Sequence, residues 1–139
     1  MNPFGGKTQE KEPSLPFAFA PQIRCCVVLG RDGKRLKVTW REGPVTLEPD
    51  TDIDLILQHA AICRKRDNFN SRYHGSTRSL VVESDRLTLI VFPIADKLVL
   101  VTADPDFPLN RTAELGKILE RLYYWMGETH ECEVVASKA

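Results

Sequence analysis

The stretch from residue 78 to residue 103 constrains the fold most strongly, because it is mostly apolar and interrupted only twice by short polar groups. The interruptions at 84–86 and 95–97 read Ser-Asp-Arg and Ala-Asp-Lys, residue types that are common in tight turns. The stretch therefore predicts three consecutive antiparallel strands. Between residues 87 and 94, apolar side chains occupy both alternating sets of positions. Both faces of the predicted sheet are thus expected to need cover.

Length and charge limit the classes of protein to which the chain can belong. A chain of 139 residues corresponds to one domain, which can bury a core without the help of disulfides or a metal. Its 19 lysines and arginines balance its 19 aspartates and glutamates, so the net charge is zero. This balance argues against a protein whose main role is to coat nucleic acid.

The cysteines and the lack of long apolar runs predict the compartment. The four cysteines show no Cys-x-x-Cys spacing, so we expect free thiols in a reducing environment. No segment has the apolar length of a signal peptide or of a membrane-spanning helix. We therefore expect a cytoplasmic protein that has no membrane partner.

The first part of the chain predicts a leader followed by a β-hairpin. Residues 1–21 carry glycines and prolines among charged residues, and we expect them to form a flexible leader or an irregular first helix. The apolar run at 23–29 predicts a buried strand, and the alternating pattern at 34–41 predicts its partner. Gly-Arg-Asp-Gly at 30–33 supplies the residue types that a tight hairpin turn needs.

A first amphipathic helix is predicted from residue 52 to residue 66. Thr51 with Asp54 three positions on resembles a capping box with the shorter acid. The cations at 64–66 fall in the last turn, where the helix dipole favours positive charge. The apolar residues of this segment have helical spacing and are Ile53, Ile56, Leu57, Ala60 and Ala61.

A second helix is predicted beyond the three-strand stretch. Asn110 is suited to the N-cap position and Gly127 to the end of the helix. The apolar residues between them repeat with helical period and are Leu115, Ile118, Leu119, Leu122, Tyr123 and Met126. We assign residues 22–127 to one domain and expect residues 128–139, which show no usable period, to form a tail.

The predicted order of elements is strand, strand, helix, three strands, helix. Because helices are needed on both faces, this order predicts an α/β (α+β) domain with a five-stranded antiparallel sheet between helices, in three layers. The sequence resembles the roadblock family of profilin-like domains, which includes dynein roadblock light chains, Ragulator subunits and a bacterial regulator of the gliding-motility GTPase. The resemblance rests on IRCCVVLGRDG at 23–33 and LVVESDRLTLIVFPIADKLVLVT at 80–102. RKRDNF at 64–69 is most similar to small uncharacterised archaeal members.

This resemblance implies a non-catalytic protein-interaction module that forms homodimers and needs no cofactor. Roadblock domains pair through their second helix and the strand that follows it, and the dimers serve as platforms for small Ras-like GTPases or as scaffold subunits. On this chain the corresponding elements are the helix at 52–66 and the strand at 78–84. The expected interface residues are Ile53, Ile56, Leu57, Ala60, Leu80 and Val82.

No residue pattern indicates catalysis or a metal site. The sequence lacks a Walker loop, G-x-G-x-x-G, H-E-x-x-H and G-x-S-x-G, and its three histidines are scattered. Cys25 and Cys26 are expected to be core residues rather than a redox pair. Acidic residues near strand ends are expected to serve turns rather than a cation; they are Glu83, Asp85, Asp96, Asp104 and Asp106.

Two aromatic residues are candidate binding anchors. Buried aromatic side chains dominate many interfaces, which draws attention to Trp40 and Trp125. A simpler interpretation of Trp125, at the end of an amphipathic helix, is a residue of the core or its rim.

Two alternative functions stay open at this level. A basic segment contains Arg64, Lys65, Arg66 and Arg72 and continues to Arg78, and it is a candidate contact for phosphates or an acidic partner. Weak nucleic-acid binding through residues 64–78 is one alternative, although the helix dipole explains most of these cations. The other is a PAS- or GAF-like sensor, which holds a small ligand between sheet and helix.

Overall fold

The computed structural model describes residues 16–30, 34–41, 58, 61, 62, 65, 75, 77–127 and 132–137. Six strands form one sheet: β1 (Ile23–Leu29), β2 (Arg35–Arg41), β3 (Leu80–Glu83), β4 (Thr88–Ile94), β5 (Lys97–Ala103) and β6 (Glu133–Ser137). A short 3-10 helix, η2 (Leu109–Arg111), leads into the helix α2 (Thr112–Tyr123).

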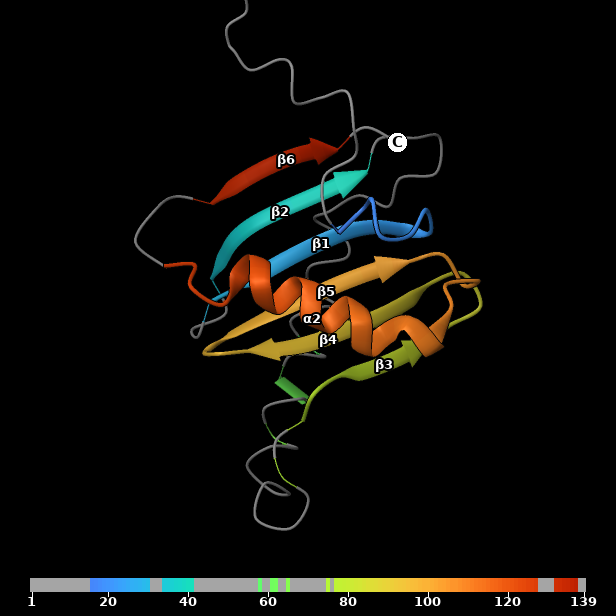
Figure 1. The fold of residues 1–139 in the computed structure, drawn as a ribbon, viewed down its shortest axis with the longest axis horizontal. Helices are drawn as coiled ribbons and strands as arrows, with labels where there is room; N and C mark the ends of the chain where they lie inside the picture. Colours follow the sequence, from blue (N-terminus) through green and yellow to red (C-terminus); the bar gives the residue numbers. More distant parts are fainter. Residues whose placement is uncertain are drawn as a thin grey trace, which may run out of the picture.

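The strands are arranged in the order β3-β4-β5-β1-β2-β6 (Figure 1). The first five strands in this order pair antiparallel, which confirms the predicted five-stranded antiparallel sheet. β6 adds a sixth strand that runs parallel to β2. The last residues of the chain were expected to form a tail, so a strand at Glu133–Ser137 departs from that expectation.

Tight turns join the strands of the meander where the sequence predicts them. In the turn between β3 and β4, the Ser84 amide donates to the Leu87 carbonyl at 2.8 Å. In the turn between β4 and β5, Ala95 adopts a positive φ of 55°, which a two-residue hairpin turn requires of its first residue. β1 then pairs with β5 and lies near the middle of the sheet.

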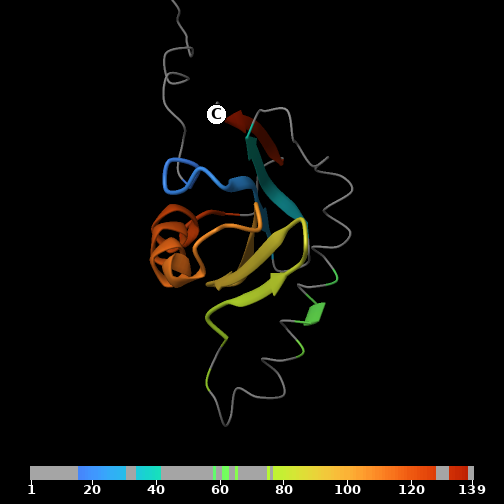
Figure 2. The same ribbon diagram turned by 90° about the vertical axis from the view of Figure 1, so that its right-hand side faces the viewer.

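The helix α2 covers one face of the sheet (Figures 1 and 2). Its buried residues Leu115, Leu119 and Tyr123 repeat at i, i+4 and i+8, so they form one stripe that packs on the strands. The strands contribute large apolar side chains to this layer: Ile23, Val28, Leu36, Ile90, Phe92, Ile94, Val99 and Val101. Burial of this stripe supplies most of the free energy that holds α2 on the sheet.

The opposite face of the sheet is also buried, as its double-sided apolar pattern predicts. Its cluster consists of Cys25, Val27, Leu29, Val38, Leu89, Val91, Leu98 and Leu100. The described helical residues at 58, 61, 62 and 65 lie on this side, away from α2 (Figure 2). Cys25 and Cys26 belong to different faces, are both buried and form no disulfide, which confirms their prediction as core residues.

The segment just before β1 packs into the core instead of belonging wholly to a leader. Phe17 is only 2% exposed, and Ala20 is also buried. The guanidinium of Arg41, at the end of β2, donates to the carbonyls of Phe17 and Ile23 at 2.8 Å each and of Ala20 at 3.2 Å. These hydrogen bonds satisfy buried backbone oxygens and hold the segment against the end of β2.

The beginning and end of α2 differ from the sequence-based expectation. Asn110 lies inside η2 and is not the N-cap; Arg111 holds that position and makes no side-chain capping bond. Instead the Thr112 hydroxyl donates to the Leu109 carbonyl at 2.8 Å. The helix ends at Tyr123, before the expected terminator Gly127. The Lys97 ammonium binds the Tyr124 carbonyl at 3.1 Å and so satisfies a carbonyl at the helix end.

Candidate functional site

The strand β3 forms one edge of the sheet, and no described strand lies beyond it. Successive residues of an antiparallel strand direct their backbone groups alternately to the two sides. Because the Ser84 amide bonds towards β4, Leu80 and Val82 also face β4, and the N–H and C=O of Val81 face outward. The side chain of Val81 is 36% exposed. The edge therefore offers both unpaired backbone groups and an apolar side chain.

The structure places two of the expected interface residues on this edge strand. Leu80 and Val82 are partly buried, and their side chains pack against the core cluster of the face opposite α2. The other four, Ile53, Ile56, Leu57 and Ala60, lie outside the described residues.

The described residues of the first predicted helix present one exposed helical face. Gln58, Ala61, Ile62 and Lys65 are all helical and exposed, and their spacing places them on one side of a helix. Ile62 is 53% exposed and adds an apolar side chain to this face. Of the basic segment, Lys65 and Arg78 are described and both are exposed, whereas Arg64, Arg66 and Arg72 lie outside the described residues.

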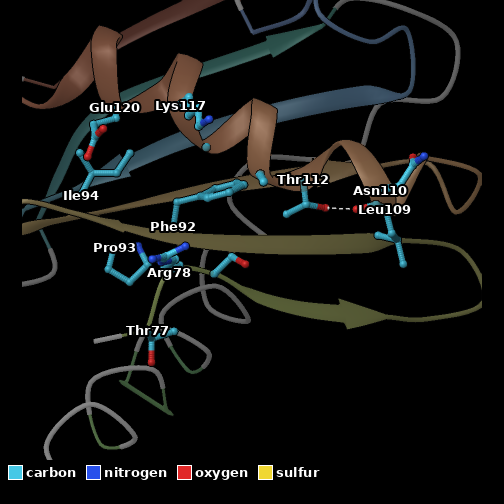
Figure 3. A pocket seen from close by; sticks show the side chains of 13 residues that line it. Thr77, Arg78, Phe92, Pro93, Ile94, Leu109, Asn110, Thr112, Lys117 and Glu120 are labelled. Carbon is cyan, nitrogen blue, oxygen red and sulfur yellow. Dashed lines mark hydrogen bonds between the residues drawn. The ribbon is translucent and has the colours of Figure 1, made fainter. Parts of the chain in front are cut away.

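A groove lies where β3 stops short of the end of β4. The last pair between the two strands is Leu80 with Val91, so residues 92–94 of β4 have no partner from β3. Residues 77–79 form one wall of the resulting gap, and α2 forms the other (Figure 3). The groove has a volume of about 650 Å³, which falls in the range of small-molecule sites.

The floor of the groove is apolar and its walls carry charge. Phe92 and Ile94 line the floor, where Gly116 lets α2 approach closely; a Cβ at Gly116 would lie 3.1 Å from the Phe92 ring. Lys117 lies on the α2 wall and Arg78 on the opposite wall, with Phe92 between them (Figure 3). The remaining lining residues are Thr77, Ser79, Pro93, Leu109, Asn110, Thr112, Ala113 and Glu120.

The charged groups on the other half of the sheet have structural partners. Arg24 forms a two-pronged ion pair with Asp104, and this hydrogen bonding raises the pKa of Arg24. Burial lowers the pKa of Arg41, whose guanidinium is held by backbone carbonyls. Asp104, predicted as a turn residue, thus also anchors β1.

The described residues offer no catalytic constellation. They contain no cluster of three or more metal-ligating side chains. Burial raises the pKa of the Cys26 thiol to about 12, so it stays protonated and is a poor nucleophile at neutral pH. Within the same residues, no helix is both long and apolar enough to cross a bilayer.

Trp125 does not belong to the core or its rim. It is 88% exposed, and its ring stands edge-on to that of Tyr124 with the ring centroids 4.8 Å apart. The expectation of a packed residue is wrong because position 125 lies off the buried stripe that ends with Tyr123, whereas the next residue, Met126, packs against the core. Trp40, in contrast, is partly buried against the core cluster opposite α2.

Comparison with known structures identifies the fold. A roadblock/LC7 domain from Streptomyces avermitilis shares 22% identity at a TM-score of 0.55, over 76% of this chain and 88% of that one. The gliding protein MglB from Thermus thermophilus shares 19% identity at a TM-score of 0.59, over 73% and 76% of the two chains. MglB from Myxococcus xanthus shares 13% identity at a TM-score of 0.55, over 75% and 85%.

No family model matches the sequence, and no curated protein matches it either. At these identities the structural likeness shows a roadblock/LC7 fold. The expected closeness to archaeal members stays a prediction.

Proposed function

We propose that this chain is a non-catalytic protein-interaction module that pairs with a second copy of itself. The observation that carries the proposal is the open β3 edge in a roadblock fold, with the backbone of Val81 facing outward and its side chain 36% exposed. Antiparallel pairing of two such edges would join two sheets into one and satisfy the backbone groups of both. A related MglB structure is described as having a tetrameric arrangement, so self-association occurs in a protein of this fold.

The exposed helical face supports the same interface. Ile62 is 53% exposed, and the described helical residues at 58, 61, 62 and 65 lie on the side of the sheet away from α2 (Figure 2). In the family that the sequence resembles, the helix before the edge strand and the strand itself form one interface. We therefore extend the proposed interface from Leu80 and Val82 to Val81 and Ile62, and keep Ile53, Ile56, Leu57 and Ala60 in it.

We further propose that the dimer serves as a scaffold or regulator for a small Ras-like GTPase in the cytoplasm. Proteins of the resembled family act in this way, and the gliding protein MglB shares the fold. The net charge of zero is compatible with a protein partner and gives no reason to expect nucleic acid.

Light scattering after size exclusion, across a dilution series, tests the dimer. We expect a mass near twice 15.7 kDa that falls towards the monomer on dilution. Val81→Lys should shift the equilibrium to monomers, because it places a charge at the edge that has to pair. The matched control is Leu122→Lys, since Leu122 on α2 is similarly exposed, at 41%. A monomer at every concentration, or equal effects of both variants, would refute this interface.

The GTPase proposal needs its own test. The wild-type chain and Val81→Lys are used to capture partners from cells of the source organism, in the presence of a non-hydrolysable GTP analogue or of GDP. We expect a Ras-like GTPase to be retained in one nucleotide state and only by the dimeric protein. Failure to retain any GTPase would remove this proposal and leave the dimer intact.

A further inference from the structure

The groove between α2 and β4 has the make-up of a binding site for an amphipathic molecule. Its apolar floor, with Phe92 and Ile94, continues to Ala113 and Gly116 on α2. The pattern of an apolar surface with a few converging polar groups is typical of small-molecule sites. The groove lies on the α2 side of the sheet, whereas the described helical residues at 58, 61, 62 and 65 lie on the opposite side (Figure 2).

Two cations at the groove lack ionic partners in the described part of the chain. Arg78 and Lys117 lie on opposite walls of the groove, with Phe92 between them (Figure 3). The ion pairs identified among the described residues involve neither of them. Glu120 lies on α2 one turn beyond Lys117 and carries the opposite charge. The field in the groove is therefore most favourable to an anion between Arg78 and Lys117, and less so towards Glu120.

The open edge of β4 in the groove is a poor place for an added peptide strand. Val91 directs its backbone groups towards β3, so the next position with this orientation is Pro93. Proline has no backbone N–H, and it is typical of sheet edges that do not pair further. Because strand addition depends on backbone hydrogen bonds, this edge favours a small molecule over a peptide.

We propose that this groove binds a small organic anion in which one carboxylate or phosphate head is joined to an apolar body. The head lies between Arg78 and Lys117, where both cations are within the same opening. The apolar body lies beside Phe92 and Ile94 and extends along Ala113 and Gly116 of α2. The site lies on the α2 side of the sheet, beside the β3 edge, and its occupant would be a regulatory ligand of the module.

Titration of the isotope-labelled protein with octanoate, followed by amide NMR, tests the proposal. We expect the largest shifts at Gly116, Ala113 and Ile94, which line the groove. Octanol, with the same chain and no charge, should bind about tenfold more weakly, because two exposed ionic contacts are lost. Equal binding of octanol and octanoate, or shifts centred on Trp125 instead of the groove, would overturn the proposal.

Octyl phosphate distinguishes the two head groups. Tighter binding than octanoate assigns a phosphate head, and equal or weaker binding assigns a carboxylate; both results support an anion site. No shift with either compound, up to their solubility limits and with the protein folded, would refute the site.

Charge variants separate the site from general surface attraction. The double variant Arg78→Ala/Lys117→Gln should weaken octanoate binding about tenfold, whereas Arg86→Ala, an exposed cation in the β3–β4 turn, should leave it unchanged. Glu120→Gln should tighten binding about twofold, since it removes a like charge near the head. An equal loss in the Arg86 variant would mean that the anion is attracted by overall charge and would overturn the assignment.

A steric variant tests where the apolar body lies. Ala113 is exposed on α2 and lines the groove, so Ala113→Leu should reduce the free volume without disturbing the core. We expect this variant to lose octanoate binding while its circular dichroism spectrum and unfolding midpoint stay unchanged. Unaltered binding would place the ligand elsewhere.

Discussion

The two halves of the sheet differ in how far their backbone polar groups are paired within the chain. In the half around β1 and β2, buried polar side chains tie backbone segments together, and β6 covers the edge of β2. In the half around β3 and β4, the edge strand is short, and Val81 turns its backbone outward. The cations of this second half, Arg78 among them, face solvent.

This difference separates residues that hold the fold from residues that are free to bind. Arg41 and Asp104 already bind other parts of the same chain, so substitutions there should lower the free energy of unfolding. Val81 and Lys117 contribute little to the core, so substitutions there should change dimer association or ligand affinity instead. The comparison is therefore open to direct tests, which differ in the size of the expected effect.

The largest effect is expected from Arg41→Ala. The change removes three hydrogen bonds from a buried guanidinium and takes this donor from the carbonyls of Phe17 and Ile23, while the Ala20 carbonyl keeps its bond from the Ile23 amide. We expect a loss of about 3 kcal/mol in the free energy of unfolding, measured by urea denaturation. Arg86→Ala, on the open half, should change it by less than about 0.5 kcal/mol. Equal losses in both variants would contradict the division into two halves.

A smaller loss is expected when β6 is removed. Ending the chain after Cys132 deletes the parallel ladder from the Lys37–Glu133 pair to the Arg41–Ser137 pair. We expect a loss of about 2 kcal/mol from these backbone hydrogen bonds, together with concentration-dependent association through the newly open β2 edge. A chain that ends after Ser137 is the matched control and should behave as the full chain does. An unchanged stability of the shorter chain would mean that β6 does not close this edge.

The buried thiol of Cys26, on β1, predicts a specific pH dependence of stability. In the native state the pKa of Cys26 is about 12, whereas in the unfolded chain it has its ordinary value of 9.0. The unfolded chain therefore releases this proton at a lower pH. Between these values the native state binds more protons, so this thiol lowers stability as pH rises, by about 1.4 kcal/mol per pH unit. Cys26→Ala should flatten the pH profile of unfolding free energy above pH 9. Cys132→Ala, at an exposed thiol, should leave its slope unaltered.

The smallest effect on stability is expected from Val81→Lys. The outward-facing position at the β3 edge can place a lysine in solvent, so the monomer should lose less than about 0.5 kcal/mol. Thermal unfolding at protein concentrations below the dissociation constant of the dimer measures this change in the free energy of unfolding. A large loss would show that the β3 edge is needed for the fold of the monomer. It would contradict the proposed difference between this half of the sheet and the half around β2.

Local sequence patterns were sufficient to predict the parts of the fold that depend on neighbours in the chain. Apolar alternation and turn residues predicted β1 to β5 close to their observed limits, and helical spacing predicted the buried stripe of α2. The same patterns placed Cys25 and Cys26 in the core, since both alternating faces of β1 are apolar.

The features that sequence reasoning missed depend on distant contacts or on where an element stops. β6 pairs with a strand almost a hundred positions earlier, so no turn sequence next to it predicts the pairing. Arg24 meets Asp104 across 80 positions, so no spacing rule could indicate the ion pair. The groove exists because β3 begins only at Leu80, opposite Val91, while β4 continues to Ile94. Composition does not show this difference in strand length.

The position of β1 between β2 and β5 has a consequence for how the chain folds. The β1–β2 and β4–β5 hairpins need only short loops, and such hairpins form within microseconds. Docking β1 on β5 closes a long loop, because the Arg24–Asp104 ion pair at its end spans 80 positions. We expect this docking to be the slow step, with φ-values near one in the β4–β5 hairpin and near zero at Arg24. Until it occurs, the apolar faces of both hairpins stay exposed to other chains.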